Sequence, residues 1–107
     1  MSKVQWEISN DEVTDRDTAL RRLQEGTTGH VVCARDGACL QSYKEADGIY
    51  HCEIVFKTGS CCPPVFAAPE GVTGQELETL YDRFASGDDF SFVEKEWEPL
   101  STATATM

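Results

Sequence analysis

Residues 29–57 decide the fold, and their sequence is GHVVCARDGACLQSYKEADGIYHCEIVFK. Runs rich in valine, isoleucine, tyrosine and cysteine are separated by two Asp-Gly pairs, Asp36-Gly37 and Asp47-Gly48. Asp-Gly between strand-like runs favours a type I′ turn, because that turn needs a positive φ at both central residues. The stretch therefore predicts a three-strand antiparallel meander.

Two-residue turns would pair Arg35 with Ala38 and Ala46 with Ile49, and this register assigns each side chain to one of two faces. The first face carries Val32, Ala34, Cys39, Gln41, Tyr43, Tyr50, Cys52, Ile54 and Phe56. The second face carries Val31, Cys33, Leu40, Ser42, Ile49, His51, Glu53 and Val55. The first face holds more large apolar groups, so we expect the helices to cover it and the second face to stay open.

A strand and a helix are expected before the meander. Val4, Trp6 and Ile8 alternate with polar residues, which is typical of a strand with one exposed side. Capping residues in 10–15, followed by apolar residues at helical spacing before Gly26, predict a helix over roughly residues 14–25.

After the meander, a loop, a second helix and a closing strand are expected. The proline-rich residues 58–69 predict a loop with a short edge strand around Val65-Phe66. Thr73-Gly74-Gln75-Glu76 has the pattern of a capping box, and the helical spacing of apolar residues continues from it until Gly87. Residues 90–99 have the pattern of a strand with its glutamates on one side.

Together these elements predict one α+β domain over residues 1–100. The expected architecture is a mostly antiparallel sheet, made of an N-terminal strand, the meander and a C-terminal strand, with two helices packed on one face. The polar, repetitive residues 101–107 are expected to form a disordered tail.

The charge balance limits the expected partners. The 107 residues include 19 acidic and 9 basic side chains, which give a formal net charge of −10. Binding to nucleic acid or to an anionic membrane needs clustered Lys and Arg, so we expect neither. A basic protein partner would be complementary, and a charge that serves only solubility is the alternative. Without a signal-like N-terminus or a membrane-length apolar stretch, the expected location is the cytoplasm.

The cysteines and histidines are the candidates for chemistry. Adjacent cysteines cannot easily both reach one metal ion, so Cys61, Cys62 and His51 are only weak candidates for a zinc or thiol site, and we expect no cofactor. The odd number of cysteines, without a repeated spacing, argues for free thiols, with Cys33, Cys39 and Cys52 as small apolar sheet residues. No nucleophile motif or glycine-rich phosphate loop occurs, so we expect a protein that is not an enzyme.

Carboxylates concentrate near the end of the chain, and two interpretations of them stay open. They form either a solvated acidic face or a patch that binds a partner. The residues concerned are Asp88, Asp89, Glu94, Glu96 and Glu98.

The order of these elements, together with Phe84, Gly87, Asp88 and Trp97, resembles the small immunity proteins of bacterial polymorphic toxin systems. The likeness is to the family whose members end in an aromatic-rich helix, a Gly-Asp turn and a strand bearing tryptophan, and it spans most of residues 4–100. It implies a non-enzymatic inhibitor that binds the catalytic domain of a cognate toxin and blocks substrate access. On that mechanism the five carboxylates would steer a basic toxin, and Phe66 or the open sheet face would supply apolar anchors.

Two other classes of function stay open. One is a small dimeric regulatory or scaffold module that associates through the second sheet face. The other is a thiol or zinc protein that uses Cys61, Cys62 and His51. For the protein in general we expect a monomer or a weak homodimer.

Overall fold

One antiparallel sheet organises the computed structural model, which describes residues 4–9, 12–35, 37–56, 64–88 and 90–99. Within these residues the sheet has eight strands in the order β2-β1-β3-β4-β5-β6-β8, and β7 pairs with β5. The strands are β1 (Gln5–Ile8), β2 (Glu12–Thr14), β3 (His30–Arg35), β4 (Ala38–Ala46), β5 (Ile49–Phe56), β6 (Val65–Ala67), β7 (Val72–Thr73) and β8 (Glu98–Pro99). The helices are α1 (Arg16–Glu25), α2 (Gly74–Ala85) and α3 (Val93–Glu96).

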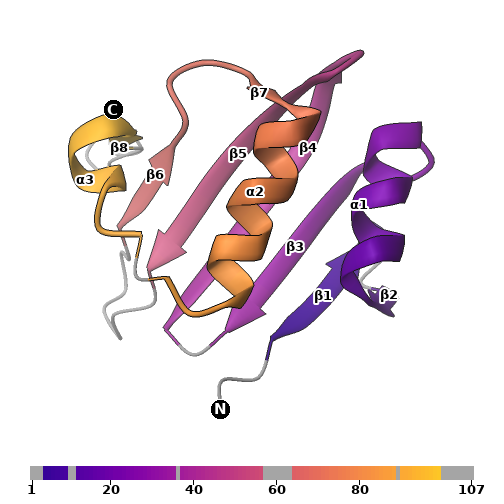
Figure 1. Cartoon of the computed structure of the whole chain (residues 1–107), viewed down its shortest axis with the longest axis horizontal. Helices are drawn as coiled ribbons and strands as arrows, with labels where there is room; N and C mark the ends of the chain where they lie inside the picture. Colours follow the sequence, from indigo (N-terminus) through magenta and orange to yellow (C-terminus); the bar gives the residue numbers. More distant parts are fainter. Residues whose placement is uncertain (1–3, 10–11, 36, 57–63, 89, 100–107) are drawn as a thin grey trace, which may run out of the picture.

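The predicted α+β architecture is confirmed, with both long helices on one face of the sheet. Helix α1 packs on β1, β3 and β4, and α2 packs on β3 and β5 (Figure 1). Short helix α3 lies beside the β6–β8 edge (Figure 1). None of the described helices is long and apolar enough to cross a membrane. The predicted tail, residues 101–107, lies outside the described residues.

The meander and its two tight turns are confirmed. Arg35 pairs with Ala38 and Ala46 pairs with Ile49, as the Asp-Gly signals predict. The glycine of the second turn, Gly48, has φ 75°, a conformation that glycine adopts without steric cost. Next to the second turn, a β-bulge between Lys44 and Ala46 shifts the rest of β4 by one residue against β5.

This bulge makes the predicted assignment of faces wrong. It places Ser42 opposite Cys52, whereas the regular register would place Tyr43 there, and a slip of one residue moves a strand's side chains to the other face. On β3 and β4 the side predicted to be open is therefore the buried one, whereas on β5 the prediction holds. The buried side chains of these strands are Val31, Cys33, Ala38, Leu40, Ser42, Tyr50, Cys52 and Ile54.

The prediction that Cys39 and Cys52 share a face is wrong for the same reason. Cys33 and Cys52 are both fully buried on the helix side, and Cys39, next to Leu40 on β4, points to the other face and is only half-buried. The buried Cys33 and Cys52 are free thiols.

Local signals place the helix ends close to where they were expected. Helix α1 begins after Asp15, whose carboxylate accepts the backbone N–H of Thr18 at 2.8 Å. It starts later than predicted because Thr14 belongs to β2, a strand that the sequence did not indicate. The capping box of α2 is confirmed, since Thr73 and Glu76 each accept the other's backbone N–H.

The predicted closing strand is wrong for most of its length. Residues 93–96 form helix α3, and only Glu98–Pro99 pair with β6. The aromatic rings explain the change: Phe90 is fully buried edge-on against Phe84, with 5.6 Å between centroids. Glu94 and Glu96 consequently lie on a helical turn, where residues two apart point in different directions.

Candidate functional site

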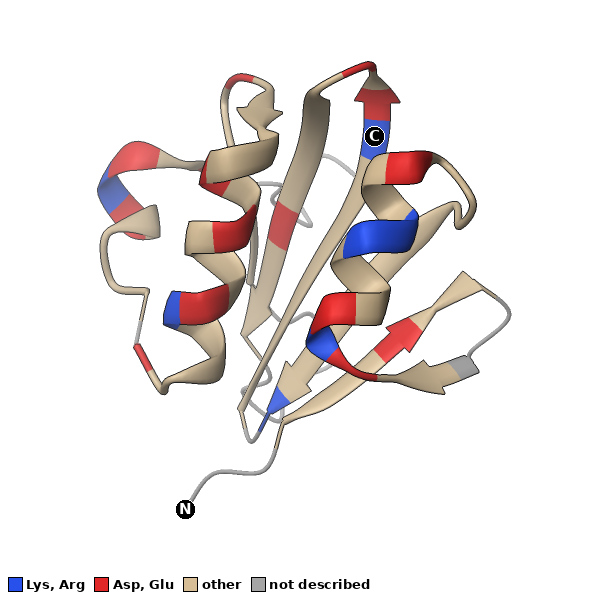
Figure 2. Ribbon diagram, turned by 45° about the vertical axis from the view of Figure 1, so that its right-hand side comes forward, with Lys and Arg blue, Asp and Glu red and all other residues tan. Residues whose placement is uncertain are grey.

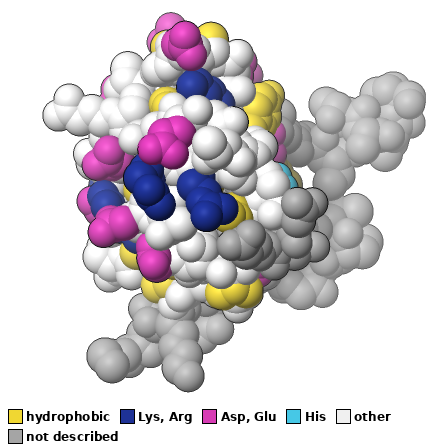
Figure 3. All heavy atoms as spheres, turned by 90° about the vertical axis from the view of Figure 1, so that its right-hand side faces the viewer, with side chains coloured by type: hydrophobic (Ala, Val, Ile, Leu, Met, Phe, Trp, Pro, Cys, Tyr) yellow, Lys and Arg dark blue, Asp and Glu magenta, His cyan; other side chains and the backbone are white. Residues whose placement is uncertain are grey.

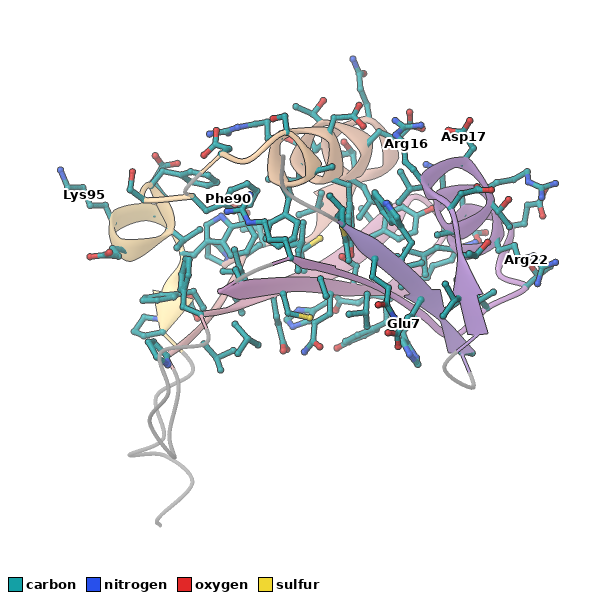
Figure 4. All side chains as sticks on the ribbon, turned by 90° about the horizontal axis from the view of Figure 1, so that it is seen from below. Glu7, Arg16, Asp17, Arg22, Phe90 and Lys95 are labelled. Carbon is teal, nitrogen blue, oxygen red and sulfur yellow. The ribbon has the colours of Figure 1, made fainter. Side chains whose placement is uncertain are left out.

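The side of the sheet opposite α1 and α2, here called the helix-free face, is the candidate functional site. In Figure 4 the two long helices lie above the sheet and no described helix lies below it. Strand alternation places on this face the side chains of Glu7, Val13, Val32, Ala34, Cys39, Gln41, Tyr43, Ile49, His51, Glu53, Val55 and Glu98. Three large apolar residues are exposed in the described part of the chain, namely Val13 at 64%, Tyr43 at 46% and Ile49 at 38%, and all three belong to this face.

The helix-free face carries acidic side chains but no Lys or Arg in the described part of the chain. Glu7, Glu53 and Glu98 lie on it. The two basic residues of the described strands point to the helix side instead: Arg35 donates to the backbone carbonyl of Phe84, and Lys44 donates to that of Gln24. The other described basic residues belong to the helices (Figure 2).

Basic and acidic side chains lie side by side around α1, unlike on the helix-free face. Figure 3 shows Lys and Arg side chains interspersed with Asp and Glu on the side of the molecule where α1 lies. Arg16 contacts Asp17 at 2.7 Å and Asp82 at 2.6 Å, an arrangement that joins α1 to α2. Charges of both signs are therefore mixed on this surface.

A polar cluster at the centre of the helix-free face surrounds Glu53. The register places Gln41 opposite Glu53 and Tyr43 opposite His51. Such cross-strand neighbours interact directly. The Gln41 amide nitrogen donates to one carboxylate oxygen of Glu53 at 3.0 Å, and Nε2 of His51 lies 2.7 Å from the other. The Tyr43 ring stacks on His51, with 4.9 Å between centroids.

This cluster lines a hollow of about 320 Å³. The side chain of Glu53 is 22% exposed and that of His51 is 24% exposed, so both are accessible from the hollow while largely enclosed. The residues around it are His30, Val32, Gln41, Ser42, Tyr43, His51 and Glu53. Larger hollows exist elsewhere, about 490 Å³ beside β1 and β2 and about 420 Å³ between α2 and the β6–β7 connection. The hollow at Glu53 stands out by its chemistry, because it combines a carboxylate, a phenol ring and imidazole.

The two fully buried thiols, Cys33 and Cys52, are not activated for nucleophilic chemistry at neutral pH. Burial raises the pKa of Cys33 to about 12 and that of Cys52 to about 11, so both remain protonated. Within the described residues no group of three or more His, Cys, Asp or Glu side chains could hold a metal ion. Cys61 and Cys62 lie outside the described residues, and His51 lies on the helix-free face, away from the buried thiols.

The described carboxylates that were interpreted either as a binding patch or as a solvated acidic face lie in different surroundings. Asp88 follows α2, accepts the backbone N–H of Phe90 at 2.8 Å and contacts Arg83 at 3.0 Å. The hydrogen bond from Phe90 and the nearby Arg83 lower the pKa of Asp88 below its ordinary value. Glu94 and Glu96 are exposed on α3, whereas Glu98 lies on the helix-free face. Asp89 lies outside the described residues.

Phe66, predicted as an apolar anchor, lies on the helix side of the sheet. It pairs with the buried Ile54 and is itself half-buried, with its ring edge-on to Phe56 at 6.0 Å between centroids. An exposed apolar side chain beside the Glu53 cluster is instead Tyr43, whose ring packs against His51. Gln41, Tyr43 and Glu53 were not singled out as site residues from the sequence, because the bulge that brings them opposite their partners has no sequence signal of its own.

Comparison with known proteins gives no relative: no family model, curated protein or solved structure matches the chain. What the site does is therefore inferred from its own geometry and charge, together with the resemblance described above.

Proposed function

We propose that this protein is a non-catalytic inhibitor that binds a basic protein through its helix-free face. In line with the resemblance to immunity proteins, the proposed partner is the catalytic domain of a toxin. The observation that carries the proposal is the composition of the helix-free face, where exposed apolar side chains are combined with carboxylates and with no Lys or Arg of the described residues. A surface of this kind complements a basic partner in charge, and its exposed apolar groups supply contact area.

The whole chain supports the same kind of partner. A net charge of −10 attracts a basic molecule at long range and raises the rate of encounter. After encounter, exposed aromatic and aliphatic groups such as Tyr43 and Val13 would lose their water contacts. A toxin that acts on nucleic acid needs a basic cleft for its substrate, and an acidic protein seated on that cleft would exclude the substrate.

The charge of the helix-free face argues against the alternative of a homodimer through this face. A second copy would bring Glu7, Glu53 and Glu98 against the same carboxylates, without a cation of the described residues to pair with them. Like charges across an interface cost binding free energy. In addition, Val31, Cys33 and Leu40, which the scaffold hypothesis placed on an open face, are fully buried under the helices.

The test is capture of the partner with the full chain and two matched charge-reversal variants. Glu7→Lys/Glu53→Lys alters the helix-free face, whereas Glu94→Lys/Glu96→Lys makes the same charge change on α3. Proteins retained from the native lysate are identified by mass spectrometry, and the candidate partner is purified and assayed with equimolar chain. The proposal predicts a basic partner whose enzymatic activity is inhibited, with retention lost in the first variant and kept in the second.

Two outcomes would overturn it. One is equal retention of the partner by both variants, which would remove the helix-free face from the interface. The other is a retained partner whose activity the chain leaves unchanged, which would remove inhibition from the function.

A further inference from the structure

The carboxylate of Glu53 is held in a fixed orientation at the hollow of the helix-free face. Its two oxygens each receive one contact, from Gln41 at 3.0 Å and from His51 at 2.7 Å. A carboxylate oxygen has two lone pairs, so each oxygen can accept one further hydrogen bond. Glu53 is thus preorganised to receive a ligand that donates to both oxygens at once.

The charge of this carboxylate has no permanent counter-charge in the described part of the chain. The groups that contact it are a neutral amide and an imidazole, and no described Lys or Arg forms an ion pair with it. Its side chain is 22% exposed, so it has lost much of its water while it stays reachable. A partly desolvated carboxylate gains more from a cation than a fully solvated one does.

The surroundings of Glu53 suit a planar cation better than a compact ammonium. A guanidinium group presents parallel N–H donors that match both oxygens of a carboxylate, and it also stacks on aromatic rings. The Tyr43 ring, 46% exposed, provides such a surface next to His51. The volume of about 320 Å³ is at the small end of ligand pockets, which suits a single side chain.

We propose that the hollow at Glu53 is the receptor for an arginine side chain of the basic partner. Glu53 would form the paired hydrogen bonds, Tyr43 would cover the guanidinium plane, and Gln41 would hold the carboxylate in place. The inference rests on the proposed function in that the arginine belongs to the protein that the helix-free face binds. It goes further by naming the chemical group that is recognised and the residues that recognise it.

The experiment uses the ¹⁵N-labelled full chain and small arginine derivatives, so it does not depend on isolating the partner. N-acetylarginine amide is titrated at pH 8, where histidine side chains are ordinarily uncharged, and backbone amide shifts are followed. N-acetylcitrulline amide, which has nearly the same shape but no charge, is the matched ligand, and N-acetyllysine amide tests the preference for a planar cation. All titrations are made at one ionic strength.

The expected result is a saturable shift centred on Gln41, Tyr43 and Glu53, with the arginine derivative binding roughly tenfold or more tightly than the citrulline derivative. The lysine derivative should bind more weakly than the arginine one. Glu53→Gln should weaken arginine binding by roughly tenfold or more. Glu94→Gln, which removes the same charge on α3 outside the helix-free face, should leave it unchanged.

Equal binding of the arginine and citrulline derivatives, or unchanged binding by Glu53→Gln, would overturn the arginine receptor. If Glu53→Gln does not fold, arginine binding is measured with Tyr43→Leu, which keeps the carboxylate and removes the stacking ring. Full binding by that variant would also count against the proposal. If the arginine titration fails while capture of the partner still depends on the helix-free face, only the arginine receptor is refuted. Loss of face-dependent capture would remove the proposed function, whatever the arginine titration shows.

Discussion

The hydrogen bond between Tyr81 and Ser42 couples helix α2 to the sheet, and it allows a quantitative test of the fold. Tyr81 is fully buried, and its hydroxyl donates to Oγ of Ser42 at 2.8 Å. Ser42 in turn donates to the sulfur of Cys52 at 3.1 Å. Burial raises the pKa of Tyr81 well above its ordinary value, so the hydroxyl stays protonated and remains a donor.

The double-mutant cycle of Ser42→Ala and Tyr81→Phe should be clearly non-additive. Ser42→Ala leaves the Tyr81 hydroxyl with only longer contacts, at 3.3 Å to the carbonyl of Val31 and 3.5 Å to that of Leu40. A buried donor left so poorly satisfied costs about 1–3 kcal/mol of unfolding free energy. Tyr81→Phe alone should cost about 1 kcal/mol, because Ser42 keeps its contact with Cys52. The double variant removes both polar groups, so it should be more stable than the sum of the single changes predicts, by about 1 kcal/mol or more.

The assay is urea denaturation, followed by tryptophan fluorescence and far-ultraviolet circular dichroism. Trp6 is a suitable probe because its ring lies 5.4 Å from that of Tyr81. For a domain of this size, 1 kcal/mol corresponds to a shift of Tm by about 4 °C. Tyr43→Phe, at an exposed tyrosine, is the control and should change stability by less than about 0.5 kcal/mol. Additivity of the two core changes within about 0.3 kcal/mol would refute the proposed coupling.

Three further predictions concern the bulge, the thiols and the acid response. Deleting Glu45, between the bulged positions Lys44 and Ala46, keeps Ser42 opposite Cys52 and should cost about 1 kcal/mol or less of unfolding free energy in urea titrations, whereas a cost above about 3 kcal/mol would contradict the bulge. Cys33 and Cys52 should resist iodoacetamide at pH 8 in the folded protein and react after denaturation, as peptide mapping would show; rapid labelling in the folded state would be inconsistent with their burial. Asp88 has a lowered folded pKa, so its ionised form stabilises the fold above an unfolded pKa of about 4, and this contribution is lost as the pH falls through the folded pKa. Asp88→Asn should therefore lower the urea midpoint at pH 7 and much less at pH 2, and an equal deficit at both pH values would rule out the charge as the cause.

The cluster around Glu53 illustrates what no pattern within a single strand could reveal. Gln41 and Glu53 are twelve positions apart in the chain, and they face each other only because the bulge at Glu45 sets the register of β4 against β5. A strand pair accommodates an extra residue when this lets the helices bury the right side chains. Here the buried side chain is Leu40, and its burial under the helices exists only in the assembled core. The described carboxylates near the end of the chain likewise lie on α3, on β8 and after α2, because residues 93–96 are helical and the aromatic rings around them pack together.

The sequence by itself determined the features that depend on neighbouring residues. The two Asp-Gly turns, the capping box at Thr73 and Glu76 and the α+β class with its helices on one face are set by backbone preferences and by hydrogen bonds within a few positions, and they were predicted without tertiary information. The tertiary structure decided the bulge, the buried face of β3 and β4 and the helical form of residues 93–96. These follow from packing between distant segments, where burial of large side chains outweighs the local preference of any one strand.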